Sequence, residues 1–217
     1  MSDKMRSSRL PLYRLQVYTN ITILTFLFID ALHCKDPAKA LNLTSHMIPL
    51  LDRTCPPSSH PTLALLRLHQ LLLVSSLAST SSSTGIPVQD EAIHATARAV
   101  AGLTAVLEEG HPARGVLIAE LGKLLAMDEQ PQPGTSSPSR INLSGQSEVF
   151  PPTGAARLEL AIDTLKRARK ELIIGFGEST EGGEVGVAMR DDIIALETEL
   201  SIWRRAFSNN LQSKSLA

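Results

Sequence analysis

Histidines and carboxylates are the residues of this sequence best suited to chemistry, and none of them has the spacing of a familiar catalytic or metal site. The sequence holds six histidines but no H-E-x-x-H pair, and no other spacing supports metal binding by a pair such as His94 with Glu91. Asp191 and Asp192 are adjacent, so on a helix they cannot face one substrate. No serine lies in a G-x-S-x-G elbow. We therefore expect no catalytic residue and no metal site in this chain.

The segment 175–183 (GFGESTEGG) is rich in glycine and invites comparison with phosphate-binding loops. It follows an expected helix rather than a strand, lacks a Gly-Lys-Ser/Thr sequence, and carries Glu178 and Glu181, which would repel phosphate. We interpret it as a helix C-cap and turn, and we expect no nucleotide or other cofactor.

The two cysteines, Cys34 and Cys55, are too few for a structural zinc site. Two thiols in a chain of this size are typical of reduced cysteines in a cytoplasmic or nuclear protein, which is the localisation we expect. A disulfide between them is the alternative.

The charge of the chain does not suit a nucleic-acid-binding protein, which would carry an excess of basic residues. The formal net charge is -1. The basic run 166–170 is balanced on the same expected helix by three carboxylates, Glu159, Asp163 and Glu171, so we interpret it as part of a solvent-exposed helix face. Hydrophobic residues form 43% of the chain and aromatic residues only 4%. A core of Leu, Ile, Val and Ala favours helix-on-helix packing over a sheet.

Residues 1–35 form the most ambiguous segment. Basic residues precede the apolar stretch 21–32 (ITILTFLFIDAL), in the order of a secretory signal. Asp30 interrupts this stretch, no small-x-small cleavage site follows it, and it is short for a membrane span. We expect a buried helix over 11–34; a strand, a targeting segment or an anchor is the alternative.

Helical periodicity predicts the remaining elements. Asp36 is the expected N-cap of a helix that Pro49 kinks or shortens, and Gly110 is expected to end the fourth helix. Further helices are predicted over 61–78, 88–109, 112–127, 155–174 and 184–207. We divide the chain into an N-terminal helix (1–35), a helical repeat region (36–127), a disordered loop (128–153), a helical hairpin (154–208) and a tail (209–217).

Two apolar helices begin with the same dipeptide, His60-Pro61 and His111-Pro112, about fifty residues apart. A repeat of helix pairs explains this echo, because each pair buries only one face until it stacks on the next. We predict an all-α fold: a tetratricopeptide-like, antiparallel helix-pair solenoid of about seven helices. Trp203 and Phe207, one turn apart, are either a recognition stripe for a partner or core packing.

The segments 109–127 and 158–200 carry a further pattern, whose positions are His111, Pro112, Gly115, Gly122, Gly175 and Gly177, with His60 and Pro61 in the preceding repeat. In these positions the chain from about residue 36 onward resembles the C-terminal tetratricopeptide-like region of SET-and-MYND-domain protein lysine methyltransferases, especially fungal ones. Several of the positions are also generic features of helical hairpins.

The chemistry of that family does not carry over to this chain. Its SET domain uses an Asn-His motif, a catalytic tyrosine and a cysteine cluster, and its MYND module binds zinc; the sequence has no Asn-His dipeptide and no zinc cluster. The resemblance therefore implies S-adenosylmethionine and zinc only for a protein in which these helices are joined to SET and MYND domains. We expect a helical protein-interaction domain that binds a protein or peptide, with a fragment of an active methyltransferase and a membrane-anchored helical protein as the alternatives.

Overall fold

A computed structural model describes residues 36–79, 85–127 and 150–215, and within these ranges the chain is all-helical, as predicted. Six α-helices and no strand occur there, against the seven helices expected. The helices are α2 (Pro37–Thr54), α3 (His60–Ser79), α4 (Gly85–Thr104), α5 (Pro112–Ala126), α6 (Ala155–Phe176) and α7 (Gly183–Ser215), with a 3-10 turn η1 (Glu178–Thr180) before α7. The helix predicted over 11–34 and most of the loop predicted over 128–153 lie outside the described residues.

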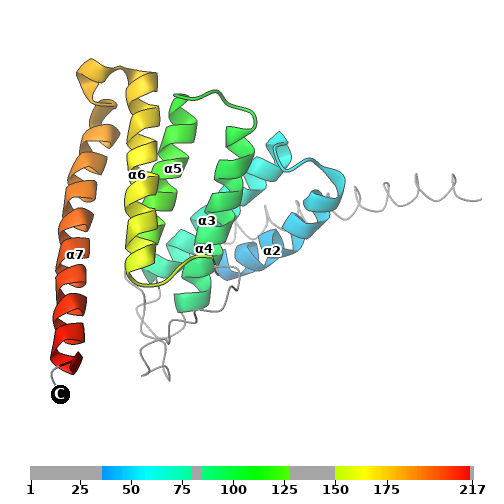
Figure 1. Ribbon diagram of the computed structural model, residues 1–217. Coiled ribbons are helices and arrows are strands. Elements are labelled where there is room, and N and C mark those ends of the chain that lie inside the picture. The colour runs from blue at the N-terminus through cyan, green and yellow to red at the C-terminus, as the bar shows by residue number, and fades with distance from the viewer. Residues whose placement is uncertain (1–35, 80–84, 128–149, 216–217) are drawn as a thin grey trace, which may run out of the picture.

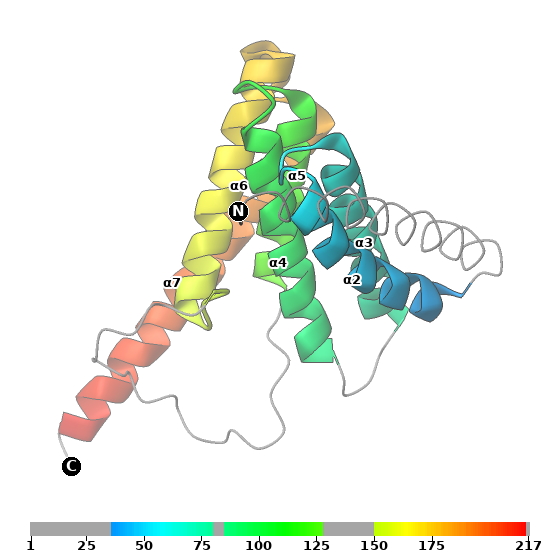
Figure 2. The same ribbon diagram turned by 90° about the vertical axis from the view of Figure 1, so that its right-hand side faces the viewer.

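Each described helix packs against the next one along the chain, from α2 to α7. Figure 1 shows the helices as a row that runs from α2 on one side to α7 on the other, and Figure 2 shows the same row from its α2 side. Among the described helices, α5 and α7 also contact each other, although α6 lies between them in the chain order. This neighbour-to-neighbour packing is compatible with the predicted stack of antiparallel helix pairs.

One apolar core extends from α3 to α7. Its side chains include Leu73, Ile93, Ile118, Leu165 and Leu172, all almost completely buried. A second, smaller cluster between α2 and α3 is formed by Ala40, Met47, Leu51 and Leu65. Because α5 and α6 share the main core, the predicted loop 128–153 does not separate two cores.

The start of α2 agrees with the prediction, whereas the end of α4 does not. Asp36 caps α2, its Oδ1 accepting a hydrogen bond from the Lys39 amide at 3.0 Å. The helix is not shortened at Pro49; it continues to Thr54, because Met47 and Leu51 on either side of the proline are buried against α3. In contrast, α4 ends at Thr104 rather than Glu109.

The early end of α4 reflects a tightening of its last turn. The Val106 amide donates to the Leu103 carbonyl at 3.1 Å, a three-residue bond instead of the four-residue bond of an α-helix. Gly110 then has φ +88°, a left-handed conformation that glycine adopts without strain, and it completes the turn into α5.

The two His-Pro dipeptides are not equivalent in the structure. His111 caps α5, its Nδ1 accepting from the Ala113 amide at 3.2 Å, and Pro112 is the first helical residue. At the earlier site His60 is itself the first residue of α3, and Ser59 precedes it. The sequence echo is therefore one residue out of register with the helix starts.

Two glycines of α5, Gly115 and Gly122, lie about two turns apart on the face that meets α6. A Cβ atom at Gly115 would lie 2.7 Å from the side chain of Leu172, and one at Gly122 would lie 2.7 Å from that of Leu165. We call this contact the α5–α6 seam. The two glycines allow the leucines of α6 to pack directly on the backbone of α5.

Candidate functional site

The histidine singled out for metal binding does not meet its expected partner. Glu91 pairs with His69 rather than His94, and His94 packs edge-on against Phe150 with ring centroids 5.3 Å apart. Among the described residues no group of three or more His, Cys, Asp or Glu side chains is placed to hold a metal ion.

A hydroxyl, an imidazole and a carboxylate do line up across three helices. Thr44 Oγ1 of α2 lies 2.8 Å from His69 Nδ1 of α3, and His69 Nε2 lies 3.2 Å from Glu91 Oε1 of α4. This is the order of a nucleophile, a base and an orienting acid. However, Thr44 is fully buried and its hydroxyl also lies 2.8 Å from the Leu41 carbonyl oxygen, so no substrate can reach it. The three groups tie α2, α3 and α4 together instead.

A second polar link joins α3 to α5. The guanidinium of Arg67 donates to both carboxylate oxygens of Glu120, and Gln70 Nε2 donates to the same carboxylate at 3.0 Å. Partial burial raises the pKa of Glu120, but the hydrogen bonds from Arg67 and Gln70 outweigh it, so the pKa is lowered overall. This pair connects the first helices of the two sequence repeats.

The third link is the most deeply buried ion pair of the described residues. Arg114 of α5 contacts Glu171 Oε1 of α6 at 2.6 Å, with side chains only 11% and 4% exposed. The Gly110 amide donates to Glu171 Oε2 at 2.6 Å, and Arg114 also donates to the Leu107 carbonyl. The interpretation of Glu171 as part of a solvated face is therefore wrong: its carboxylate holds the α4–α5 turn against α6.

An open groove of about 610 Å³ runs between α6 and α7. Isoleucines from both helices form its apolar part, and two of them are more than half exposed: Ile174 (51%) and Ile194 (56%). The charged side chains along it are Lys166, Arg169, Lys170, Glu178, Arg190 and Glu197. We call this feature the α6–α7 groove.

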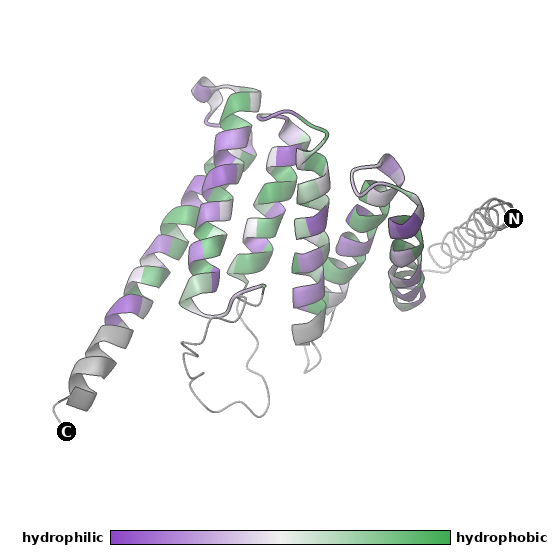
Figure 3. Ribbon diagram, turned by 45° about the vertical axis from the view of Figure 1, so that its right-hand side comes forward, coloured by the Kyte–Doolittle hydropathy of each residue, from purple (hydrophilic) through white to green (hydrophobic). Residues whose placement is uncertain are grey.

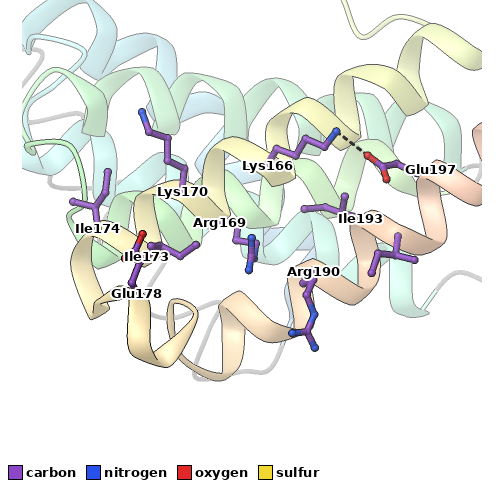
Figure 4. A pocket seen from close by; sticks show the side chains of 10 residues that line it. Lys166, Arg169, Lys170, Ile173, Ile174, Glu178, Arg190, Ile193 and Glu197 are labelled. Carbon is purple, nitrogen blue, oxygen red and sulfur yellow. Dashed lines mark ion pairs between the residues drawn. The ribbon is translucent and has the colours of Figure 1, made fainter.

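The cations of the α6–α7 groove are held by carboxylates at the surface. Lys166 bonds Glu197 at 2.7 Å across the groove, as Figure 4 shows. Lys170 bonds Glu109 at 3.0 Å, and Arg169 and Arg190 both reach Glu181. The hydrogen bond to Glu197 raises the pKa of Lys166, and the hydrogen bond to Asp191 raises the pKa of Arg190.

Exposed pairs of this kind contribute little to folding, so partner carboxylates can replace the present ones at low cost. Lys166 and Lys170 of the basic run are exposed, as the interpretation of a solvated face requires, and with Arg169 they also line the groove.

Of the aromatic pair singled out near the C-terminus, the structure describes the side chain of Trp203 but not that of Phe207. Trp203 is 48% exposed and lies outside the buried core, where it borders a hollow of about 160 Å³ with Leu158 and Met127. Phe207 belongs to α7, but its side chain lies outside the described residues. Whether the pair recognises a partner or packs within the chain stays a prediction.

The remaining sequence features have ordinary structural roles. Gly177 is the C-cap of α6, with φ +95° and its amide donating to the Ile173 carbonyl at 2.8 Å, which confirms the interpretation of the glycine-rich segment. A Cβ at Gly175 would lie 2.1 Å from the Gly110 carbonyl oxygen, so this glycine allows the α6 end to touch the α4–α5 turn. Asp191 and Asp192 have separate partners, Arg190 and Lys123.

The open groove between α6 and α7 is thus lined by both apolar and charged side chains. None of the described helices is long and apolar enough to cross a membrane. No protein-family model matches the chain, and comparison with curated proteins finds no similar sequence.

Proposed function

We propose that this chain is a helical protein-interaction domain that binds an acidic, amphipathic helical segment of a partner in the α6–α7 groove. The observation that carries the proposal is the combination of exposed isoleucines and cations along one groove. An amphipathic helix binds such a groove by placing its apolar face on the floor, and its acidic residues then meet the cations at the rim.

Energetic considerations support this choice of ligand. Burying Ile174 and Ile194 removes apolar area from water, which is the main source of affinity for a helix in a groove. The ion pairs along the groove cost little to exchange, because each has at least one exposed member. The lining itself comprises four cations and two carboxylates, and an acidic partner is favoured where its carboxylates displace Glu109 and Glu181, which hold three of these cations from outside the lining.

The proposal is tested with two labelled synthetic peptides that share leucines at three- and four-residue spacing. In one peptide the exposed positions are glutamate, and in the other they are lysine. We expect fluorescence anisotropy to give the acidic peptide a Kd of about 10–100 µM and the basic peptide at least tenfold weaker binding. Equal binding of both peptides would overturn the proposal.

Lys170→Glu provides the matching test on the protein, and Lys123→Glu is its control. Both lysines are exposed and pair with a carboxylate of a neighbouring segment, but only Lys170 lines the groove. Lys170→Glu should weaken binding of the acidic peptide about three- to tenfold, and Lys123→Glu should leave the affinity for this peptide unchanged. An equal loss in both variants would place the binding elsewhere.

We further propose that the chain is related to the C-terminal helical region of SET-and-MYND-domain lysine methyltransferases and transfers no methyl group by itself. The support is the set of sequence positions named above, of which Gly115 and Gly122 form the α5–α6 seam. Calorimetric titration with S-adenosylmethionine distinguishes this from the enzyme alternative. We expect no heat of binding, and a measurable affinity would contradict the proposal.

A further inference from the structure

The outward face of α7 is left uncovered by the other described helices. Of these, α7 contacts α6 and, to a smaller extent, α5. At 100° per residue, the positions opposite the buried residues Met189, Ile193, Leu196 and Leu200 are 191, 194, 198, 202 and 205. All five of these residues are exposed, and Ile194 and Ile202 are among the most exposed large apolar side chains described.

This outward face is self-complementary about Thr198. Ile194 and Ile202 lie four residues before and after it, and Asp191 and Arg205 lie seven residues before and after it. If two copies of the helix pair antiparallel with Thr198 at the centre, each Ile194 meets Ile202 of the second copy. In the same register each Asp191 meets Arg205 of the second copy. We propose that α7 pairs in this way with α7 of a second copy of the chain.

The charges of the face favour an antiparallel pair over a parallel one. Among the described residues Asp191 pairs only with its neighbour Arg190, and Arg205 forms no ion pair within the part of the chain that the structure describes. Arg205 is therefore available to another molecule, and the exposed pair of Asp191 with Arg190, which uses Oδ1 of the aspartate, can be exchanged at low cost. A parallel pair would place Asp191 against Asp191 and Arg205 against Arg205, which costs free energy, whereas the antiparallel pair forms two salt bridges.

The sequence of the face also suits close packing. Ala195 and Ser201 lie three residues on either side of Thr198, and such small side chains let two helices approach. Figure 3 shows hydrophobic and hydrophilic residues alternating along α7, rather than one wide apolar surface. The resulting dimer would be a row of four helices, with α6 and α7 of one copy beside α7 and α6 of the other.

The expected association is weak. The paired segment 191–205 is only about 21 Å long, and one such helix pair buries less area than a standard interface. We expect a Kd of about 10–100 µM. Ile194 borders both this face and the α6–α7 groove, so peptide and second copy should compete for that side chain, whereas Asp191, Thr198, Ile202 and Arg205 lie outside the groove lining.

Sedimentation equilibrium of the full chain tests the proposal through charge reversal. Asp191→Arg alone places two arginines together at each end of the pair, and Arg205→Asp alone places two aspartates together. Each single variant should raise the dimer Kd at least tenfold. Asp192→Arg, which reverses a neighbouring charge off the face, should leave it unchanged.

An equimolar mixture of Asp191→Arg and Arg205→Asp should recover the dimer, because both ends of the mixed pair then join opposite charges. The double variant carrying both changes should recover it as well. Recovery by mixing also shows that both single variants are folded. A monomeric wild-type chain at about 200 µM, dimers insensitive to the single changes, or a mixture that stays monomeric would each overturn the proposal.

A Thr198→Cys substitution tests the register directly in a background that carries Cys34→Ser and Cys55→Ser. Position 198 lies on the proposed two-fold axis, so oxidation should yield a covalent dimer. Glu199→Cys, one residue away and also exposed, should yield far less. Equal cross-linking of the two variants would contradict the register.

Discussion

The two faces of α6 differ sharply in how completely they are packed. On the α5 side, Leu165 and Leu172 lie on the glycine backbone of the α5–α6 seam, and the buried pair of Arg114 with Glu171 closes one end of it. On the α7 side, isoleucines and lysines stay exposed along the α6–α7 groove. The same helix thus has one face whose residues serve folding and one whose residues are free to serve binding.

The difference arises from side-chain size and length. Glycines on α5 let the leucines of α6 pack directly on the α5 backbone, whereas isoleucines and long cations of α6 and α7 line an open groove at the other face. A functional surface is expected where packing is incomplete and apolar side chains stay in water. If the packed face contributes more to folding than the open face, substitutions on the α5 side should lower the free energy of unfolding far more than substitutions on the α7 side.

The largest effect is expected from Glu171→Ala. It leaves the Arg114 guanidinium and the Gly110 amide buried without a carboxylate, which should lower the free energy of unfolding by about 3–5 kcal/mol. Chemical denaturation measures this loss. On the open face, Glu197→Ala removes the exposed pair with Lys166 and should leave the denaturation midpoint unchanged within error. Equal losses in the two variants would mean that the faces do not differ.

A smaller effect is expected from Gly122→Ala. The new methyl group would meet Leu165 at 2.7 Å, and overpacking should cost about 1–3 kcal/mol, partly offset by about 1 kcal/mol from the better helix propensity of alanine. Leu165→Ala alone should cost about 2–5 kcal/mol through the cavity it leaves. Because the methyl group introduced at position 122 fits that cavity, the double variant should lose less than the sum of the two single losses. Strict additivity would show that the two residues do not contact.

The smallest effect concerns pH. The folded-state pKa of Glu120 lies below its ordinary value, so its stabilisation is present above that ordinary value and is lost as the pH falls through the folded pKa. Because the pair with Arg67 is partly exposed, we expect Glu120→Gln to cost about 1 kcal/mol at neutral pH. Urea denaturation of the two proteins should give stabilities that converge as the pH falls below the ordinary pKa of a glutamate side chain. A constant difference over this range would contradict the assignment.

Much of the fold could be predicted because its signals are local. The Asp36 cap, the Gly177 C-cap and the periodic apolar residues of α5 to α7 each depend on neighbours within a few positions. The turn between α4 and α5 was harder to predict, since the Gly110 amide within it donates to Glu171, a residue 61 positions away. The continuation of α2 through Pro49 depends likewise on burial against α3.

The candidate site could be predicted only in part. The basic run 166–170 is visible in the sequence, but a run of charges does not show whether it faces water or a second helix. The groove exists because α7 brings Arg190, Ile193 and Ile194 beside that run. This placement depends on tertiary packing, which the local sequence does not show. The polar links of Thr44, His69 and Glu120 were missed for the same reason, because their partners lie on other helices.

The central claim is that binding occurs on the open face of α6 and not on its closed face. Amide chemical-shift mapping of the isotope-labelled full chain with the acidic amphipathic peptide tests this most directly. We predict that the shifts concentrate on residues 166–178 and 190–197, and that the amides of Gly115 and Gly122 in the α5–α6 seam stay unchanged. Shifts centred on other helices, or no shifts at saturating peptide, would contradict the account.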